Sequence, residues 1–164
     1  MAGRITKSEQ QLQPDPRYND KVLAKFTNCL MQDGKKSVAF RVVYAAFDEL
    51  DKRLEKETNP EAPQDALELF HRAIENVKPN VEVRSKRVGG ANYQVPMQVN
   101  ARRQQSLAFR WILQAVRSDR GKPMSERLAK ELFDAARREG KAYTTRENTH
   151  RMAEANKAFA HFAF

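Results

Sequence analysis

The stretch "VEVRSKRVGGANYQVPMQV", residues 81–99, decides the fold class because its two extended runs meet at a glycine pair. Alternating apolar and polar residues are typical of half-buried strands, and two such runs joined at glycines indicate a β-hairpin. No third strand is in sight elsewhere in the chain. The sequence therefore predicts a two-stranded ribbon attached to a body of another kind.

Two pairing registers are open to this hairpin. A two-residue loop at the glycine pair would mix polar and apolar side chains on both faces. An odd-numbered loop would align Val83 with Met97, leaving one largely apolar face and one polar, cationic face that carries Arg84 and Lys86. We expect the odd-numbered loop, because it separates the two kinds of side chain.

The tip of the hairpin carries groups that suit nucleic acid, since cations bind phosphates and tyrosine stacks on bases. An isolated hairpin is marginal in water, and Pro96 prevents full pairing at one edge. We expect its base to rest on the helices and its tip to meet a partner. A solvated hairpin with a routine turn remains the alternative. The residues expected at the tip are Arg84, Lys86, Arg87, Gly89, Gly90 and Tyr93, with Arg87 and Tyr93 on the side opposite Arg84 and Lys86.

The rest of the chain has helical periodicity, so we expect a mainly α domain of about six helices with a protruding hairpin arm. Residues 1–18 are expected to be a flexible arm, and residues 19–164 the helical domain, with the hairpin at about 80–99. The helix over residues 35–56 should be central. Its expected inward stripe is Val38, Val42, Ala46, Leu50 and Leu54, with Val43 and Phe47 beside it.

The ends of the helices carry capping and stop signals. Asn19 or Asp20, Asp65 and Asn100 are expected caps. Further signals are a stop at Gly34, a break at Pro79, a helix start at Pro123, a stop at Gly140, and a capping box at Thr144 and Glu147 that opens the last helix.

The composition indicates one domain with a surplus of positive charge. The chain has 164 residues and a formal net charge of +9. An acidic island over residues 48–75 is followed by a region with 18 basic and 8 acidic residues. This distribution points to a polyanion, nucleic acid first, although a merely basic surface stays open. The only cysteine, Cys29, has apolar neighbours and is expected to be a buried, inert thiol.

Enzyme, metal and membrane signals are missing from the sequence. "DGKKS", residues 33–37, ends like a phosphate loop, but Cys29 stands at the first glycine and Lys36 replaces the magnesium-binding hydroxyl residue. The histidines belong to no metal-ligand spacing, and no apolar run reaches the length of a membrane span. We expect no catalytic residue, metal, cofactor, small-molecule substrate or membrane contact.

Five ordered blocks resemble the bacterial-type small-subunit ribosomal protein seven family. They are "PDPRYND" (14–20), "LAKFTNCLMQDGKKSVA" (23–39), the hairpin (81–99), "RRQQSLAFRWIL" (102–113) and "HRMAEANKAFAHF" (150–162). The resemblance implies a non-catalytic primary binder of the 16S rRNA 3′ major domain, which nucleates the head of the 30S subunit. The expected location is a cytoplasmic ribosome, since no transit peptide is visible, and an organellar ribosome stays open as the alternative. The implied neighbours are the exit-site tRNA, the mRNA path at the subunit interface, and small-subunit proteins nine and eleven.

The expected RNA-binding residues come from three sources. The resemblance implies Lys35, Lys36, Arg84, Lys86, Arg87, Arg102 and Arg103. Periodicity adds Arg110 and Arg117, which recur with Arg103 every seven residues on one helix face. The arm adds Arg4, Lys7 and Arg17.

An architectural DNA-binding protein with a basic β-ribbon arm is the alternative from another class, because ribbons that carry proline and cations also suit a minor groove. An RNA-modifying enzyme is a third possibility, and it would require a cofactor site that the sequence does not offer.

Overall fold

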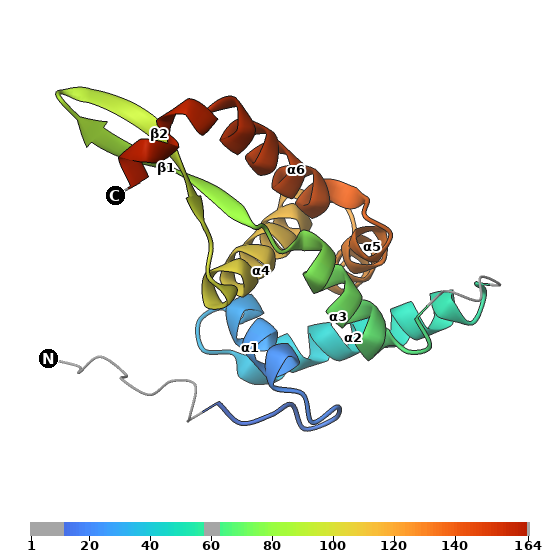
Figure 1. Cartoon of the computed structure of the whole chain (residues 1–164). Coiled ribbons are helices and arrows are strands. Elements are labelled where there is room, and N and C mark those ends of the chain that lie inside the picture. The colour runs from blue at the N-terminus through green and yellow to red at the C-terminus, as the bar shows by residue number, and fades with distance from the viewer. Residues whose placement is uncertain (1–11, 58–62, 164) are drawn as a thin grey trace, which may run out of the picture.

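The computed structural model of the chain describes residues 12–57 and 63–163 (Figure 1). The described part is mainly α, as predicted, with six α-helices, a short 3-10 helix and one antiparallel hairpin. None of its helices combines the length and the apolar character needed to cross a membrane. The elements are α1 (Lys21–Leu30), α2 (Lys36–Leu54), α3 (Ala66–Val77), β1 (Val81–Val88), β2 (Ala91–Gln98), α4 (Ala101–Ser118), α5 (Met124–Ala136), α6 (Gly140–Ala155) and η1 (Lys157–Ala163).

The core is centred on four buried phenylalanines, one from each of α1 to α4. The ring of Phe26 meets Phe70 and Phe109 edge-on, each at 5.3 Å between ring centroids, and Phe70 lies 5.7 Å from Phe47. Such tilted aromatic pairs add stabilisation beyond the area that they bury. Helices from both sides of the hairpin in sequence therefore share one core.

Helix α2 packs on α1, α3 and α5, and its buried face differs from the expected stripe. The buried residues are Ala39, Val43, Ala46, Phe47 and Leu50. The prediction for Val38 is wrong, because that side chain is 47% exposed. A strict four-residue repeat overshoots the 3.6-residue helical period by about 40° per step, so its ends rotate away from the core.

Three predicted caps are confirmed. The Asp20 carboxylate accepts from Leu23 N at 2.6 Å, at the start of α1. Asp65 starts α3 in the same way, and the Asn100 side chain accepts from Arg103 N at 2.9 Å. Because these caps lie three residues before the amide that they bind, local sequence identifies them.

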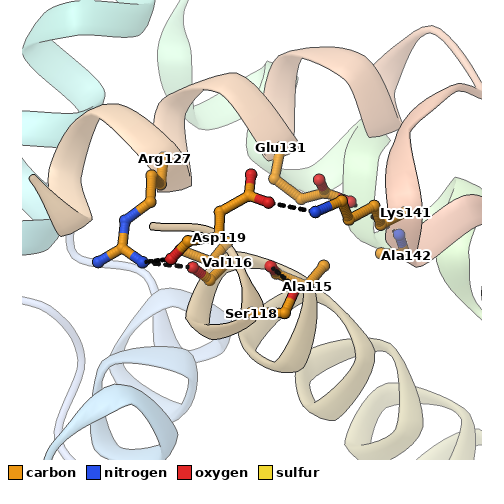
Figure 2. A network of polar contacts seen from close by, with 8 residues as sticks. All are labelled: Ala115, Val116, Ser118, Asp119, Arg127, Glu131, Lys141 and Ala142. Atoms are coloured by element: carbon orange, nitrogen blue, oxygen red, sulfur yellow. Dashed lines mark hydrogen bonds and ion pairs between the residues drawn. The ribbon is translucent and has the colours of Figure 1, made fainter. Parts of the chain in front are cut away.

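The start of α6 corrects two predictions. Gly140 was expected to stop α5, and Thr144 with Glu147 to open the last helix, but α6 begins at Gly140 itself. Thr144 lies inside the helix, where its hydroxyl donates to the Gly140 carbonyl at 2.9 Å. The cap comes from α5, where a carboxylate oxygen of Glu131 accepts from Ala142 N at 2.7 Å (Figure 2). A cap supplied by a neighbouring helix leaves no local sequence signal.

The register of the hairpin is the one that we did not expect. Val81 faces Gln98 and Val83 faces Pro96, so the loop holds two residues and the predicted odd-numbered loop is wrong. The φ angles of Gly89 and Gly90 are 57° and 89°. Two positive φ values are typical of a two-residue turn whose twist matches the strands. The glycine pair therefore sets the register, although it mixes polar and apolar residues on both faces.

The observed register regroups the side chains at the tip. Tyr93 lies opposite Lys86, whereas the prediction placed it on the same side as Arg87. Arg87 lies opposite Asn92 on the other face.

The end of the chain packs against the hairpin, which extends away from the helical body (Figure 1). The Tyr93 ring lies 5.2 Å from the ring of Phe159 and 5.1 Å from that of Phe162. Lys86 Nζ donates to the Phe162 carbonyl at 2.7 Å. The two-stranded ribbon is thus supported on one face by η1 in place of a third strand. We call this contact of η1 on the hairpin the C-terminal clasp.

Candidate nucleic-acid interface

The turn between α1 and α2 presents two of the predicted lysines. Asp33 and Gly34 have positive φ angles of 51° and 72°, which turn the chain sharply into α2. Lys35 and Lys36 follow and are exposed. Lys35 approaches the Asp33 carboxylate only at 3.7 Å, and its side chain makes no hydrogen bond to the first turn of α2. The positive end of a helix dipole and two lysines therefore meet at this turn, which suits an anion.

The three arginines that recur every seven residues on α4, Arg103, Arg110 and Arg117, have different surroundings. Arg110 and Arg117 are exposed, as the seven-residue spacing predicted. Arg117 also donates through Nη2 to the Leu30 carbonyl at 3.3 Å, which ties α4 to the end of α1. Arg103 instead points to the base of the hairpin, where its Nε donates to Glu82 at 3.1 Å. Two of the three arginines thus face solvent.

Two grooves connect these cations along one surface. The first, of about 400 Å³, is lined by Lys35, Arg117 and Arg127, by apolar residues of α1, α2 and α5, and by Gln32 and Asp33. The second, of about 630 Å³, lies between α1 and α4 and is lined by Arg110 and Arg117. Because Arg117 lines both, the lysine turn and the α4 arginines form one continuous basic surface. We call it the α1–α4 basic surface.

Two predicted cations at the hairpin share one carboxylate. Glu82 is only 7% exposed, and its oxygens bind the guanidinium groups of both Arg84 and Arg103. The Arg84 side chain is 55% exposed and that of Arg103 is 37% exposed, so both remain partly open to solvent. One negative charge offsets part of the positive charge at the base of the hairpin.

The remaining hairpin cations have different surroundings. The tip of the hairpin is exposed at Arg87, near the end of β1, and at the turn residues Gly89 and Gly90. Lys86 is exposed but donates to the Phe162 carbonyl. Arg102 is exposed at the start of α4.

Arg17 is engaged within the chain. It pairs with Asp48 at 2.8 Å, and its guanidinium lies over the rings of Tyr18 and Tyr44, at 5.1 and 5.6 Å from their centroids. The hydrogen bond that the Arg17 guanidinium donates to the Asp48 carboxylate raises the pKa of Arg17. Beside it, the buried Asp15 carboxylate accepts hydrogen bonds from the backbone N–H groups of Arg17 and Tyr18 and from the Tyr44 hydroxyl.

The other arm cations, Arg4 and Lys7, lie outside the described residues.

Arg127 is a cation at this surface that the sequence prediction missed. Its Nη1 donates to the Val116 carbonyl at 3.0 Å and also to the Asp119 carbonyl, so it binds the end of α4 from α5 (Figure 2). A cation at a helix C-terminus interacts favourably with the helix dipole. Only the packing of α5 on α4 brings this residue to the groove, and the sequence pattern around it carries no signal of that.

Cys29 corrects the prediction of a buried thiol, because the residue is exposed in the groove between α1 and α4. Desolvation by the groove raises the pKa of the thiol, and the nearby charge of Lys25 acts in the opposite direction. A raised pKa keeps the thiol protonated at neutral pH, which is unlike an activated nucleophile. Within the described residues, no three histidine, cysteine, aspartate or glutamate side chains are grouped to hold a metal ion.

Comparison with known proteins gives full-length matches. A family model described as ribosomal protein S7p/S5e matches residues 2–157. The chain is 60% identical over 162 residues to small ribosomal subunit protein uS7 of Rhodopirellula baltica, and the match covers 99% of both chains. It is 51% identical over 162 residues to the protein of the same name from Rhodospirillum centenum, again over 99% of both chains. The match to that of Nautilia profundicola is 53% over 154 residues, or 94% of both chains.

Proposed function

Since the chain belongs to the ribosomal protein S7p/S5e family, we propose that it is a primary binder of 16S-type ribosomal RNA. The family consists of structural, non-enzymatic proteins of the small ribosomal subunit. The match to one relative, at 60% identity, covers 99% of both chains. The role is therefore binding and shape stabilisation, and the question is which surface performs it.

The observation that carries the proposal is the α1–α4 basic surface. Lys35 and Arg117 line one groove, and Arg117 and Arg110 line the next. These cations come from different elements that the core holds together, so their spacing is fixed before RNA arrives. A rigid array of this kind neutralises phosphates with little loss of conformational entropy on binding.

The acidic island of the sequence lies on other segments than these cations, which belong to the turn between α1 and α2 and to α4. It occupies the second half of α2 and α3, where Asp48 and Glu49 pair with basic residues of the protein itself. RNA brought to the basic surface therefore does not have to approach these carboxylates. The segregation of charge favours one orientation of the domain on its partner.

The hairpin extends the reach of the domain beyond the basic surface. Arg87 is exposed on the face opposite the C-terminal clasp. Arg84 is held by Glu82 but half-exposed, so it can bind a phosphate without first being ordered. We propose that hairpin and basic surface hold different RNA helices of one junction, whose mutual phosphate repulsion they neutralise.

The proposal extends to the position of the domain in the ribosome. By its family, the chain would bind the 3′ major domain of 16S rRNA and nucleate folding of the subunit head. It would lie near the exit-site tRNA and the mRNA path, beside small-subunit proteins nine and eleven. The expected location is the ribosome of the cytoplasm.

A salt titration tests the RNA-binding surface. We expect Lys36→Ala to weaken binding to a head-domain fragment of 16S rRNA and to reduce the slope of log affinity against log salt by about one unit. Lys52→Ala removes the same charge from an exposed position in the acidic island, so it should leave the slope unchanged. A salt-independent affinity, or an equal effect of both substitutions, would contradict the proposal.

A further inference from the structure

The groove between α1 and α4 has the size and lining of a ligand site. Its volume of about 630 Å³ lies within the roughly 300–1,000 Å³ of small-ligand pockets. The exposed floor of the groove is mainly apolar. Beneath it lie Phe109 and Leu113, which are almost fully buried, at 1% and 4% exposure. Cys29 forms part of the α1 wall. A ligand that enters this groove would thus rest on a surface that the core supports from below.

The two walls of the groove are tied together. Lys25 Nζ donates to the side-chain oxygen of Gln105 at 3.3 Å, about one helical turn before the groove. Arg117 Nη2 donates to the Leu30 carbonyl at 3.3 Å at its other end. The groove is therefore formed before a ligand binds, which lowers the cost of ordering on association.

The rim of the groove is polar and positive. Arg110 and Arg117 belong to it, seven residues apart on α4, and its lining includes no carboxylate. The Gln114 side chain can both donate and accept hydrogen bonds. The lining thus combines an apolar floor, an amide at the edge and two cations on one side.

An unpaired RNA base fits this combination. It offers a flat apolar face, hydrogen-bonding groups at its edge, and a phosphate on either side of its sugar. Arginine binds phosphate oxygens through parallel N–H groups, which suits two cations at the rim. An apolar side chain of a protein partner would use the floor, but it would leave both arginines without an anion.

We propose that the groove between α1 and α4 receives an unpaired base of RNA, with its flanking phosphates bound to Arg110 and Arg117. The inference rests on the proposed function and adds a subsite to it. Double-stranded segments would bind the remaining cations by shape and charge. This groove would hold a nucleotide that has left its helix.

Cys29 is a built-in reporter for occupancy, because it is the only cysteine of the chain and is exposed in the groove. The experiment measures its alkylation by a neutral maleimide in the full-length protein, free and saturated with the head-domain fragment of 16S rRNA. We expect the bound RNA to slow alkylation at least about tenfold. The matched control is Cys29→Ser combined with Lys52→Cys, whose thiol on the acidic island should react at the same rate with and without RNA.

A second variant separates the groove from the phosphate contacts. Cys29→Tyr places a ring in the groove from an exposed position, so it should weaken RNA binding severalfold with an unchanged salt slope. Arg110→Ala should reduce that slope by about one unit. Equal affinity of Cys29→Tyr and wild type, with unslowed alkylation in the complex, would overturn the inference.

The outcomes distinguish the two proposals. If RNA binds with the expected salt slope but leaves Cys29 reactive, the subsite is wrong and the RNA-binding function stands. If the fragment fails to bind, the proposed function itself fails. If alkylation slows only after small-subunit proteins join the complex, the groove is a protein-docking site and the inference is overturned.

Discussion

Glu82 joins the hairpin to the helical body through Arg103, whose Nε donates to the Glu82 carboxylate at 3.1 Å. The same carboxylate binds Arg84 on its own strand. Glu82 is 7% exposed, so both ion pairs are partly shielded from water. A ribbon without a third strand needs support, and this contact supplies it at the base while the C-terminal clasp supplies it toward the tip.

We predict that Glu82→Gln destabilises the protein by about 2 kcal/mol, because a neutral amide at this buried position cannot balance the charge of two guanidinium groups. Urea unfolding of the free protein measures the change. Glu75→Gln removes an exposed carboxylate that pairs with Lys78 at the surface, so it should leave stability nearly unchanged. Equal midpoints for Glu82→Gln and wild type would show that the contact does not support the hairpin.

The C-terminal clasp should depend on the ring of Tyr93. Tyr93→Ala removes the surface against which Phe159 and Phe162 pack. We expect the amides of residues 157–162 to exchange with solvent at least about tenfold faster, while those of α5 keep their protection. Tyr93→Phe keeps the ring and should retain wild-type exchange. The interpretation fails if residues 157–162 exchange equally in Tyr93→Ala and wild type.

Asp15 should anchor the segment that precedes α1. It is 1% exposed and accepts from two backbone N–H groups and the Tyr44 hydroxyl. Asp15→Ala leaves these donors without an acceptor, and we expect a loss of about 2 kcal/mol in unfolding free energy. Thermal unfolding can compare it with Glu154→Ala, which removes an exposed carboxylate from a helix. Equal stability of the two variants would be the contrary result.

Glu131 should make stability depend on pH. Burial raises its pKa above the ordinary 4.5, with help from the charges of Asp134 and Asp119, while the Ala142 N–H and Lys141 act in the opposite direction. The folded state therefore binds the proton more tightly than the unfolded state. This contribution is complete below pH 4.5 and is lost as the pH rises through the raised pKa.

Glu131→Gln keeps an oxygen for the cap of α6 but cannot ionise. We expect its unfolding free energy to improve relative to wild type as the pH rises from about 4 to 7. Glu131→Ala also removes the titration, but it loses the cap and should be less stable than Glu131→Gln at every pH. Parallel pH profiles for wild type and Glu131→Gln would refute the assignment.

The features of the fold that depend on residues close together in the sequence could be predicted from it. Asp20, Asp65 and Asn100 cap amides three residues away, and the helical periods gave the mainly α class. The predicted register failed because the conformations of the glycine pair outweighed the separation of polar and apolar faces. The cap of α6 could not be predicted, because Glu131 reaches it only through the packing of two helices.

The candidate site likewise has a part that the sequence predicted and a part that only the fold shows. Residue type and spacing identified the exposed Arg110 and Arg117, and the resemblance pointed to Lys35 and Lys36. The sequence could not show which cations have partners inside the protein. Arg17 pairs with Asp48, 31 positions away, and Lys86 binds a carbonyl at the far end of the chain. Such pairs form only when the fold is complete.

Competition at fixed salt tests the central claim, that this surface recognises ribosomal RNA and not merely a polyanion. The full-length protein is bound to a labelled head-domain fragment of 16S rRNA, and unlabelled fragment or duplex DNA is added. We predict that duplex DNA competes only at concentrations about 1,000-fold or more above those of the unlabelled fragment. Equal competition by both would contradict the account and favour an architectural DNA-binding protein.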